Sequence, residues 1–324
     1  MTNSNFLNEI FSTTKSVVSK QPELLEEPGD KFKKTFFQPL SVGRLGEGGL
    51  RMKKLYKQND TSRPLVTVIT VVFNGADHLE ETILSILNQT YDNIEYVLID
   101  GGSTDGTLEI IKKYDTAIDY WISEKDGGIY DAMNKGIKLA TGEWINFMNS
   151  GDILYTNEVL EKIQTKLNNF SNLVYGNAEM FSEQHHVTVP NNSSSITINS
   201  FMMNMPICHQ AMFFRKKAFQ QIGLFRTNYK ICADHDWTVK YLYMGNQLEY
   251  ISINIASCRM DGVSGTSVYQ RNRERMEISL TYFPTSLWLK IYFLAIVSFF
   301  RSTTFLFFCK VNLLKIYRRF KYQL

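Results

Sequence analysis

The sequence predicts an α/β protein built on an open, mostly parallel sheet with helices on both faces. Two apolar, β-branched runs, residues 66–73 and 94–100, have the composition of buried strands. Between them, apolar residues recur at helical spacing from 79 to 87. A strand, a helix and a second strand in this order form a βαβ unit, whose strands run parallel.

The residues that flank these elements support the assignment. The first strand closes on the turn pair Asn74-Gly75, and Asp77 and Glu80 have capping-box spacing before the helix. The second strand ends on Asp100 and continues into a glycine-rich loop, residues 101–106. Open α/β sheets bind ligands at the carboxyl ends of their strands, so we expect the functional site here.

The same alternation continues along the chain. Periodicity predicts helices at 108–114, 129–140 and 217–222, a helix after 233, and strands at 118–123, 143–148, 172–177, 210–214 and 250–256. The length of 324 residues and the 44% apolar content are sufficient for one large domain with appendages.

Composition excludes some classes of protein. The net charge of +3 is too small to indicate a nucleic-acid partner. The four cysteines show no C-x-x-C spacing, and residues 1–20 lack the apolar region of a signal peptide. We therefore expect free thiols in a cytoplasmic protein.

A nucleotide ligand would be bound without the common phosphate loops. Neither G-x-G-x-x-G nor G-x-x-x-x-G-K-[ST] follows the predicted strands. The carboxylate of Asp100 can accept hydrogen bonds from a base N–H or from ribose hydroxyls, and the adjacent glycines allow the backbone to approach closely.

Three segments together resemble the family 2 glycosyltransferases over about residues 64–265: residues 66–100, the Asp-Gly-Gly-Ser-Thr-Asp run at 100–105, and Ala-Met-Asn-Lys-Gly at 132–136. The resemblance implies a GT-A fold and an inverting enzyme that uses a nucleoside diphosphate sugar, with a UDP-sugar expected. The acceptor would be a hydroxyl of a glycan or lipid-linked glycan precursor in cell-surface polysaccharide synthesis. The resemblance assigns donor contacts to Asn74, Asp100, Gly102, Ser103, Asp105, Asp126, Asn134 and Ser150. A structural role for Asn134, as a cap on a neighbouring loop, is the alternative.

The family's metal motif is incomplete in this chain. Asn149 and Gly151 stand where acids are common, and only Asp152 keeps a carboxylate. We assign Mg²⁺ or Mn²⁺ to Asp152, because one carboxylate, two diphosphate oxygens and water molecules form a reasonable Mg²⁺ shell. A helix-capping role for Asp152 is the alternative. Met133 also replaces an arginine that is usual in the family.

The catalytic base is assigned to the acidic stretch at 233–237. Asp234 matches the family's base, and Asp236 is the second candidate or an orienting residue. The alternative is a pair of acids that only stabilises a helix N-terminus. The candidates for acceptor or phosphate contacts are His209, Gln210, Trp237, Ser264 and Arg271, with Arg259 and Arg273 as substitutes; His209 has a core role as its alternative.

The expected domains are a basic N-terminal arm at 1–63, a glycosyltransferase domain at 64–283 and a basic, apolar tail at 284–324. Residues 64–152 form the nucleotide-sugar half and 153–283 the acceptor half. The arm is expected outside the sheet, with Arg51 or Lys53 as a possible phosphate ligand.

The tail holds seven basic residues and no acid, and its apolar runs are shorter than the ~20 residues that span a bilayer. We expect amphipathic helices that bind the inner face of the plasma membrane, which makes the enzyme a peripheral protein. A helix pair packed on the domain, or a dimer interface, is the alternative.

Two other functions remain open at this point. The thinned metal motif also fits a non-catalytic nucleotide- or glycan-binding partner of another transferase. A nucleotidyltransferase is disfavoured because its basic, glycine-rich phosphate signature is absent.

Overall fold

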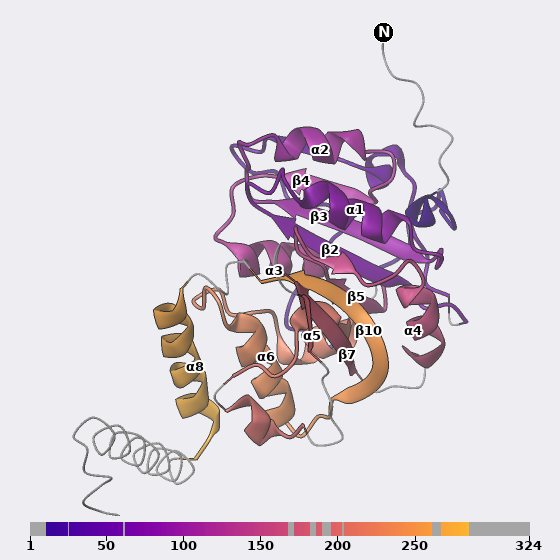
Figure 1. Ribbon diagram of the computed structural model, residues 1–324. Helices are drawn as coiled ribbons and strands as arrows, with labels where there is room; N and C mark the ends of the chain where they lie inside the picture. The colour runs from indigo at the N-terminus through magenta and orange to yellow at the C-terminus, as the bar shows by residue number, and fades with distance from the viewer. Residues whose placement is uncertain are drawn as a thin grey trace, which may run out of the picture. The chain divides into compact units, whose positions relative to one another are not determined.

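A computed structural model describes residues 11–24, 26–60, 62–167, 172–181, 186–189, 196–202, 204–260 and 267–284. The chain divides into two compact units, Met1–Arg275 and Met276–Leu324. The fold and site described below belong to the first unit. Its centre is a twisted sheet with helices packed against it (Figure 1).

The strands form one sheet in the order β1-β4-β3-β2-β5-β9-β7-β10-β6, and β8 pairs with β7. Their bounds are β1 Gly46–Gly48, β2 Val66–Val72, β3 Ile94–Asp100, β4 Tyr120–Ser123, β5 Trp144–Phe147, β6 Ile153–Leu154, β7 Leu173–Phe181, β8 His186–Val189, β9 Met212–Arg215 and β10 Glu249–Arg259. Strands β4, β3, β2 and β5 are parallel. In the second half, β9 is antiparallel to β5 and β7, whereas β10 is parallel to β7. The predicted α/β class is confirmed, and its parallel part is the βαβ half.

The helices predicted from the sequence are all present, and the described residues also form two that were not predicted, at 159–167 and 268–282. Their bounds are α1 Leu79–Leu87, α2 Thr107–Lys113, α3 Ile129–Leu139, α4 Val159–Leu167, α5 Lys216–Ile222, α6 Ala233–Tyr243 and α8 Val268–Tyr282, with short 3-10 turns η2 Ser12–Thr14, η3 Leu50–Lys53, η4 Ile198–Phe201 and η5 His209–Ala211. Among the described residues, no helix is long and apolar enough to cross a membrane.

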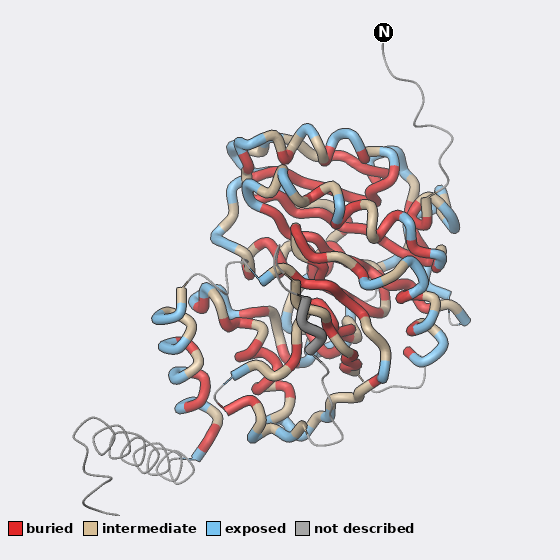
Figure 2. The backbone as a smooth tube through the Cα atoms, in the orientation of Figure 1, coloured by how far each residue is buried: buried red, intermediate tan, exposed pale blue. Residues whose placement is uncertain are grey.

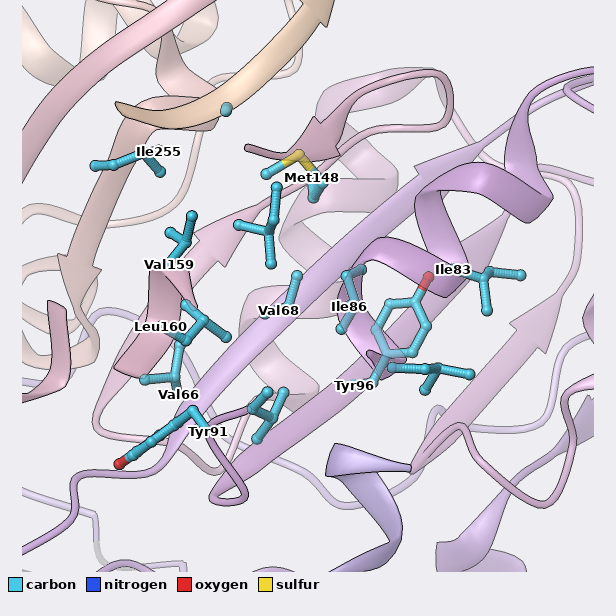
Figure 3. Close-up of a cluster of buried hydrophobic side chains, with 14 of the residues drawn as sticks. Val66, Val68, Ile83, Ile86, Tyr91, Tyr96, Met148, Val159, Leu160 and Ile255 are labelled. Carbon is cyan, nitrogen blue, oxygen red and sulfur yellow. The ribbon is translucent and has the colours of Figure 1, made fainter. Parts of the chain in front are cut away.

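Helices cover both faces of the sheet, as predicted. Val68 of β2 lies in one buried cluster with Ile83 and Ile86 of α1 (Figure 3). The next residue, Ile69, points to the other face, where a Cβ added at Gly136 of α3 would come within 2.5 Å of it. Every residue of β2 and β3 is consequently buried, and Figure 2 shows these strands in red between partly exposed helices.

The expectation that residues 1–63 lie outside the sheet is wrong for β1. Gly46–Gly48 pairs antiparallel with β4, at the edge of the sheet. Its glycines let it approach Trp121 closely, because a Cβ at Gly48 would lie 2.5 Å from the indole Nε1. A Gly-Glu-Gly strand has no apolar alternation, so its pairing depends on this tertiary contact rather than on a sequence pattern.

The proposed phosphate contacts of Arg51 and Lys53 are also not supported. Arg51 is buried and its Nη2 lies 2.6 Å from Glu95 Oε1. Lys53 forms an ion pair with Asp115, with 2.8 Å between the charged atoms. Arg51 thus attaches this segment to β3, and Lys53 attaches it to the turn after α2.

The capping box predicted before α1 does not form. The residue that caps the helix is His78, and its side chain makes no capping hydrogen bond. Glu80 instead accepts hydrogen bonds from Lys113 and from the Tyr114 hydroxyl. These side chains across the α1–α2 interface compete successfully with the local backbone for the carboxylate.

Candidate active site

A cavity of about 1010 Å³ opens at the carboxyl ends of the parallel strands. Its walls come from the turn after β2, the start of α3, the loop after β5, η5 and the residues that lead into α6. The site residues that line it, among those predicted, are Asn74, Asp126, Ser150, Asp152, His209, Gln210, Asp234, Arg259 and Arg271. Two distant parts of the sequence therefore meet in one cavity.

Asp152 lines the cavity, is buried, and accepts a hydrogen bond at each of its two carboxylate oxygens. Its Oδ2 accepts a hydrogen bond of 2.5 Å from Gln210 Nε2, and its Oδ1 accepts one of 3.0 Å from the Arg259 N–H. Burial raises the pKa of Asp152 to about 6, despite these bonds. The nearby Asn149 lines the same cavity, and its Oδ1 is buried without a hydrogen-bond partner in the described structure.

Asp234 projects from the first turn of α6 and has two polar neighbours. The Tyr130 hydroxyl is 2.8 Å from its Oδ1, and His209 Nδ1 is 3.3 Å from its Oδ2. Burial opposes ionisation, but the hydrogen bonds from His209 and Tyr130 outweigh it and hold the pKa of Asp234 below its usual value. The carboxylate is thus ionised at neutral pH and able to accept a proton.

His209 connects Asp234 to the loop after β5. Its Nε2 lies 3.2 Å from Asn149 Nδ2, while its Nδ1 faces Asp234. Burial lowers the pKa of His209, but the hydrogen bond and charge of Asp234 outweigh it, so the net shift is upward. These contacts favour a site role over the core role that was its alternative.

Asp236 and Trp237 are engaged elsewhere. Asp236 is buried, and both of its oxygens accept hydrogen bonds from the Arg226 guanidinium. Trp237 packs against Phe219, and its Nε1 donates to the Gly223 carbonyl. Neither residue lines the cavity, so the roles predicted for Asp236 as a base and Trp237 as an acceptor contact are not supported.

Asp100 fixes the loop after β3 instead of lining the cavity. Its two oxygens accept hydrogen bonds of 2.5 Å from the hydroxyls of Ser103 and Ser123. Ser103 Oγ in turn accepts from the Asn74 N–H. Asn74 adopts a left-handed φ of 51°, and its Oδ1 accepts from the Thr104 N–H, so Asn74 closes the turn over this loop.

Three more residues that were predicted as donor contacts have structural roles. Asp105 accepts hydrogen bonds from the Ala76 N–H and from Thr107. Both polar atoms of Asn134 bond the Phe225 backbone, so its alternative, structural role agrees with the contacts. Gly102 provides a φ of +87° in the turn. Ser264 lies outside the described residues.

Asp126 lies at the cavity edge near the strand ends. Its Oδ1 accepts from the Gly128 N–H at 2.8 Å, and burial raises its pKa. A Cβ at Gly101 would come within 2.8 Å of its other oxygen. Glycine at this position therefore allows the Asp126 carboxylate to approach the end of β3.

Tyr130, which was not predicted as a site residue, contacts both Asp234 and the Ile231 carbonyl. Its signal was available: an aromatic hydroxyl follows Gly127 and Gly128 at the start of a helix predicted to line the site. Three cations that were not predicted also line the cavity: Lys125, Lys230 and Arg275.

The described residues hold no group of three or more His, Cys, Asp and Glu side chains that could bind a metal ion on its own. Cys208, Cys232 and Cys258 are free thiols, as predicted. A bound cation would depend on oxygens from a ligand in addition to those of the protein.

The geometry places an ionised carboxylate in a cavity at the strand ends of an open α/β sheet, where such sheets bind their ligands. The family model described as Glycosyl transferase family 2 matches residues 67–223. A PGL/p-HBAD biosynthesis glycosyltransferase of Mycobacterium tuberculosis is 31% identical over 223 residues, which cover 67% of this chain and 85% of that protein. An uncharacterised glycosyltransferase of Rickettsia typhi is 34% identical over 195 residues, or 57% of this chain and 61% of that protein.

Solved structures have the same fold. S. aureus TarS 1–349 in complex with UDP has a TM-score of 0.54 at 18% identity, and the match covers 67% of this chain and 65% of TarS 1–349. The complex of TarS 1–349 with UDP-GlcNAc has a TM-score of 0.53 at 20% identity, with 63% and 61% covered. The chain thus spans slightly less than two thirds of these structures. It belongs to the family 2 glycosyltransferases, and its fold is of the GT-A type.

Proposed function

We propose that the protein is an inverting glycosyltransferase. It would move a sugar from a nucleoside diphosphate donor, a UDP-sugar, to a hydroxyl of a glycan or lipid-linked glycan precursor in cell-surface polysaccharide synthesis. The observation that carries the proposal is Asp234, an ionised carboxylate that lines the same cavity as Asp152. Asp234 is the proposed catalytic base.

The chemistry is a single displacement. The acceptor oxygen forms a bond to the anomeric carbon while the bond from that carbon to the diphosphate oxygen breaks, which inverts the configuration. Asp234 takes the hydroxyl proton, and Tyr130 and His209 hold its carboxylate in place. Negative charge accumulates on the departing diphosphate, and the cationic side chains of Lys230, Arg259 and Arg275 line the cavity that would receive it.

A divalent cation, Mg²⁺ or Mn²⁺, fits the oxygens present. Asp152 offers a carboxylate, and the buried Asn149 Oδ1 has no hydrogen-bond partner among the described residues. These two groups would hold the ion together with the donor diphosphate, and hard oxygen ligands are those that Mg²⁺ prefers. When bound, the cation supplies positive charge that stabilises the leaving diphosphate.

The proposed donor and location rest on two further observations. TarS, which has the same fold, has been solved with UDP and with UDP-GlcNAc, so this fold accepts a uridine nucleotide. The basic tail at 284–324, of which residues 285–324 lie outside the described structure, supports a peripheral position on the cytoplasmic membrane face.

The first test is thermal unfolding of the full-length protein with a panel of UDP, UDP-glucose, UDP-GlcNAc and GDP-mannose, with and without Mg²⁺ or Mn²⁺. A ligand at a hundred times its Kd adds about 2.7 kcal/mol to the free energy of unfolding, which raises Tm by several degrees. We expect stabilisation by a uridine nucleotide only when the metal is present. Asp152→Asn should abolish the metal-dependent part.

Asp77→Asn is the matched control, because Asp77 is exposed and lies outside the cavity lining. It should respond to nucleotide and metal as the wild type does. Equal stabilisation with and without metal would remove the cation from the proposal. Absence of stabilisation by every nucleotide would favour the alternative function, a glycan-binding partner of another transferase.

A further inference from the structure

Glu274 of α8 is a buried carboxylate outside the cavity that accepts three backbone hydrogen bonds. Its Oε1 lies 2.8 Å from the Lys230 nitrogen, and its Oε2 lies 2.9 Å from the nitrogens of both Ile231 and Cys232. Gln270 donates a further bond of 3.0 Å to Oε1. One side chain, more than forty residues away in sequence, therefore fixes three consecutive peptide groups.

These three peptide groups lead directly to the proposed base. Helix α6 begins at Ala233, and Asp234 is its second residue. The capping residue Cys232 makes no side-chain hydrogen bond to the helix; its thiol instead donates a long bond of 3.7 Å to the Arg271 carbonyl of α8. Glu274 supplies an external anchor for that entry.

The same segment also contacts the group that orients the base. The Tyr130 hydroxyl lies 2.6 Å from the Ile231 carbonyl and 2.8 Å from Asp234 Oδ1. A shift of the 230–232 backbone would thus move the base and change the position of its hydrogen-bonding partner. Lys230, the first of these residues, lines the cavity as well.

We propose that Glu274 is a positioning residue for catalysis, which sets the location of Asp234 through the backbone of residues 230–232. The inference rests on the proposed role of Asp234 as the base. Glu274 itself does not line the cavity. The long, flexible side chain of Lys230 can absorb a small shift of its backbone, whereas the short side chain of Asp234 cannot. The effect of Glu274 should therefore fall on the rate of sugar transfer rather than on donor binding.

Glutamine cannot replace Glu274 in this role, although its size is the same. A carboxylate has about four lone-pair sites, whereas an amide offers one acceptor oxygen and an NH₂ group that donates. Either orientation of the amide would direct an NH₂ group at a backbone N–H. The bonds to residues 230–232 would not all be made, and misplacement by about 1 Å costs roughly 100-fold in rate.

The experiment measures kcat and KM for hydrolysis of whichever sugar nucleotide in the panel stabilises the wild type most, with water as the acceptor and nucleotide release as the readout. For Glu274→Gln we expect kcat to fall by about 10- to 100-fold while the donor KM and the nucleotide-dependent Tm shift stay within about twofold of wild type. The kcat of Glu274→Asp, which keeps the charge, should lie between the kcat of the wild type and that of Glu274→Gln. Glu274→Asp also provides the measurement if the Gln variant does not fold.

Glu277→Gln is the matched control, because Glu277 is an exposed acid on the same helix; its kinetics should equal those of the wild type. Wild-type kcat in Glu274→Gln and Glu274→Asp would overturn the inference, and so would a parallel loss of donor affinity and kcat. The variant Asp234→Asn separates the two proposals. If Asp234→Asn retains full turnover, the assignment of Asp234 as the base fails. If Asp234→Asn loses turnover while Glu274→Gln keeps it, only the inference about Glu274 is contradicted.

Discussion

At the scale of single residues, the chemistry of Asp234 depends on its two neighbours. A buried carboxylate alone would have a raised pKa and would be protonated more readily. The hydrogen bonds from His209 and Tyr130 reverse that shift. Because the proton-accepting form is thereby maintained in a buried position, removal of the charge should abolish the base and leave the donor site unchanged.

Asp234→Asn should therefore lower the rate of donor turnover by about 100-fold or more, the usual contribution of a general base. The nucleotide- and metal-dependent rise in Tm should stay as in the wild type, since Asp152 and Asn149 are unaltered. The configuration of the wild-type hydrolysis product, followed by NMR before mutarotation, should be opposite to that of the donor. Retention of configuration would contradict a single displacement.

A site residue could be predicted from the sequence when its polar atoms face the cavity, and not when they bond another part of the fold. Asp152 and Asp234 were assigned from the family's acidic motifs, and both line the cavity together with the predicted contact Gln210. Asp100 and Asn134 were assigned to the donor, yet their polar atoms bond Ser123 and the Phe225 backbone. A sequence pattern predicts the local element in which a polar residue lies, but it does not identify the distant group with which that residue forms its hydrogen bonds.

At the scale of elements, the same limit explains the N-terminal segment. The βαβ strands were predicted to within a residue because strands covered on both faces are continuously apolar. Strand β1 and turn η3 have no such pattern, and their attachment depends on Arg51, whose guanidinium bonds Glu95 and the carbonyls of Phe36 and Leu139. A buried charge with several partners takes the place of apolar packing here.

Arg51→Met should therefore lower the free energy of unfolding by about 3–5 kcal/mol, because it leaves the buried Glu95 carboxylate without its ion-pair partner. The loss should be visible as a lower midpoint in urea unfolding with an unchanged slope. The double variant Arg51→Met/Glu95→Gln should recover part of it, since no uncompensated charge remains.

Lys53→Met provides the control for this element, because its ion pair with Asp115 is partly exposed. Solvent screens such a pair, so we expect a change of at most about 1 kcal/mol. Equal effects of the Arg51 and Lys53 substitutions would contradict the view that the buried ion pair anchors the segment.

At the scale of the whole molecule, basic charge is concentrated in the tail. Residues 284–324 contain seven Lys and Arg and no acid, whereas the entire chain has a net charge of only +3. The rest of the chain must then carry a net negative charge of −4, from +3 minus +7. Attraction to an anionic surface is therefore expected from the tail alone.

Replacement of Lys315, Arg318, Arg319 and Lys321 by Gln in the full-length chain tests this division. Each cation near an anionic bilayer contributes about 1 kcal/mol, so four substitutions should weaken binding to phosphatidylserine vesicles by roughly 1,000-fold in a sedimentation assay. The nucleotide-dependent Tm shift should not change. Replacement of the exposed Lys53, Lys112, Lys162 and Lys166 alters the net charge equally and should leave vesicle binding in place. If the tail variant sediments like the wild type, the tail does not bind the membrane through its charge, and the alternative of a helix pair packed on the domain or at a dimer interface takes its place.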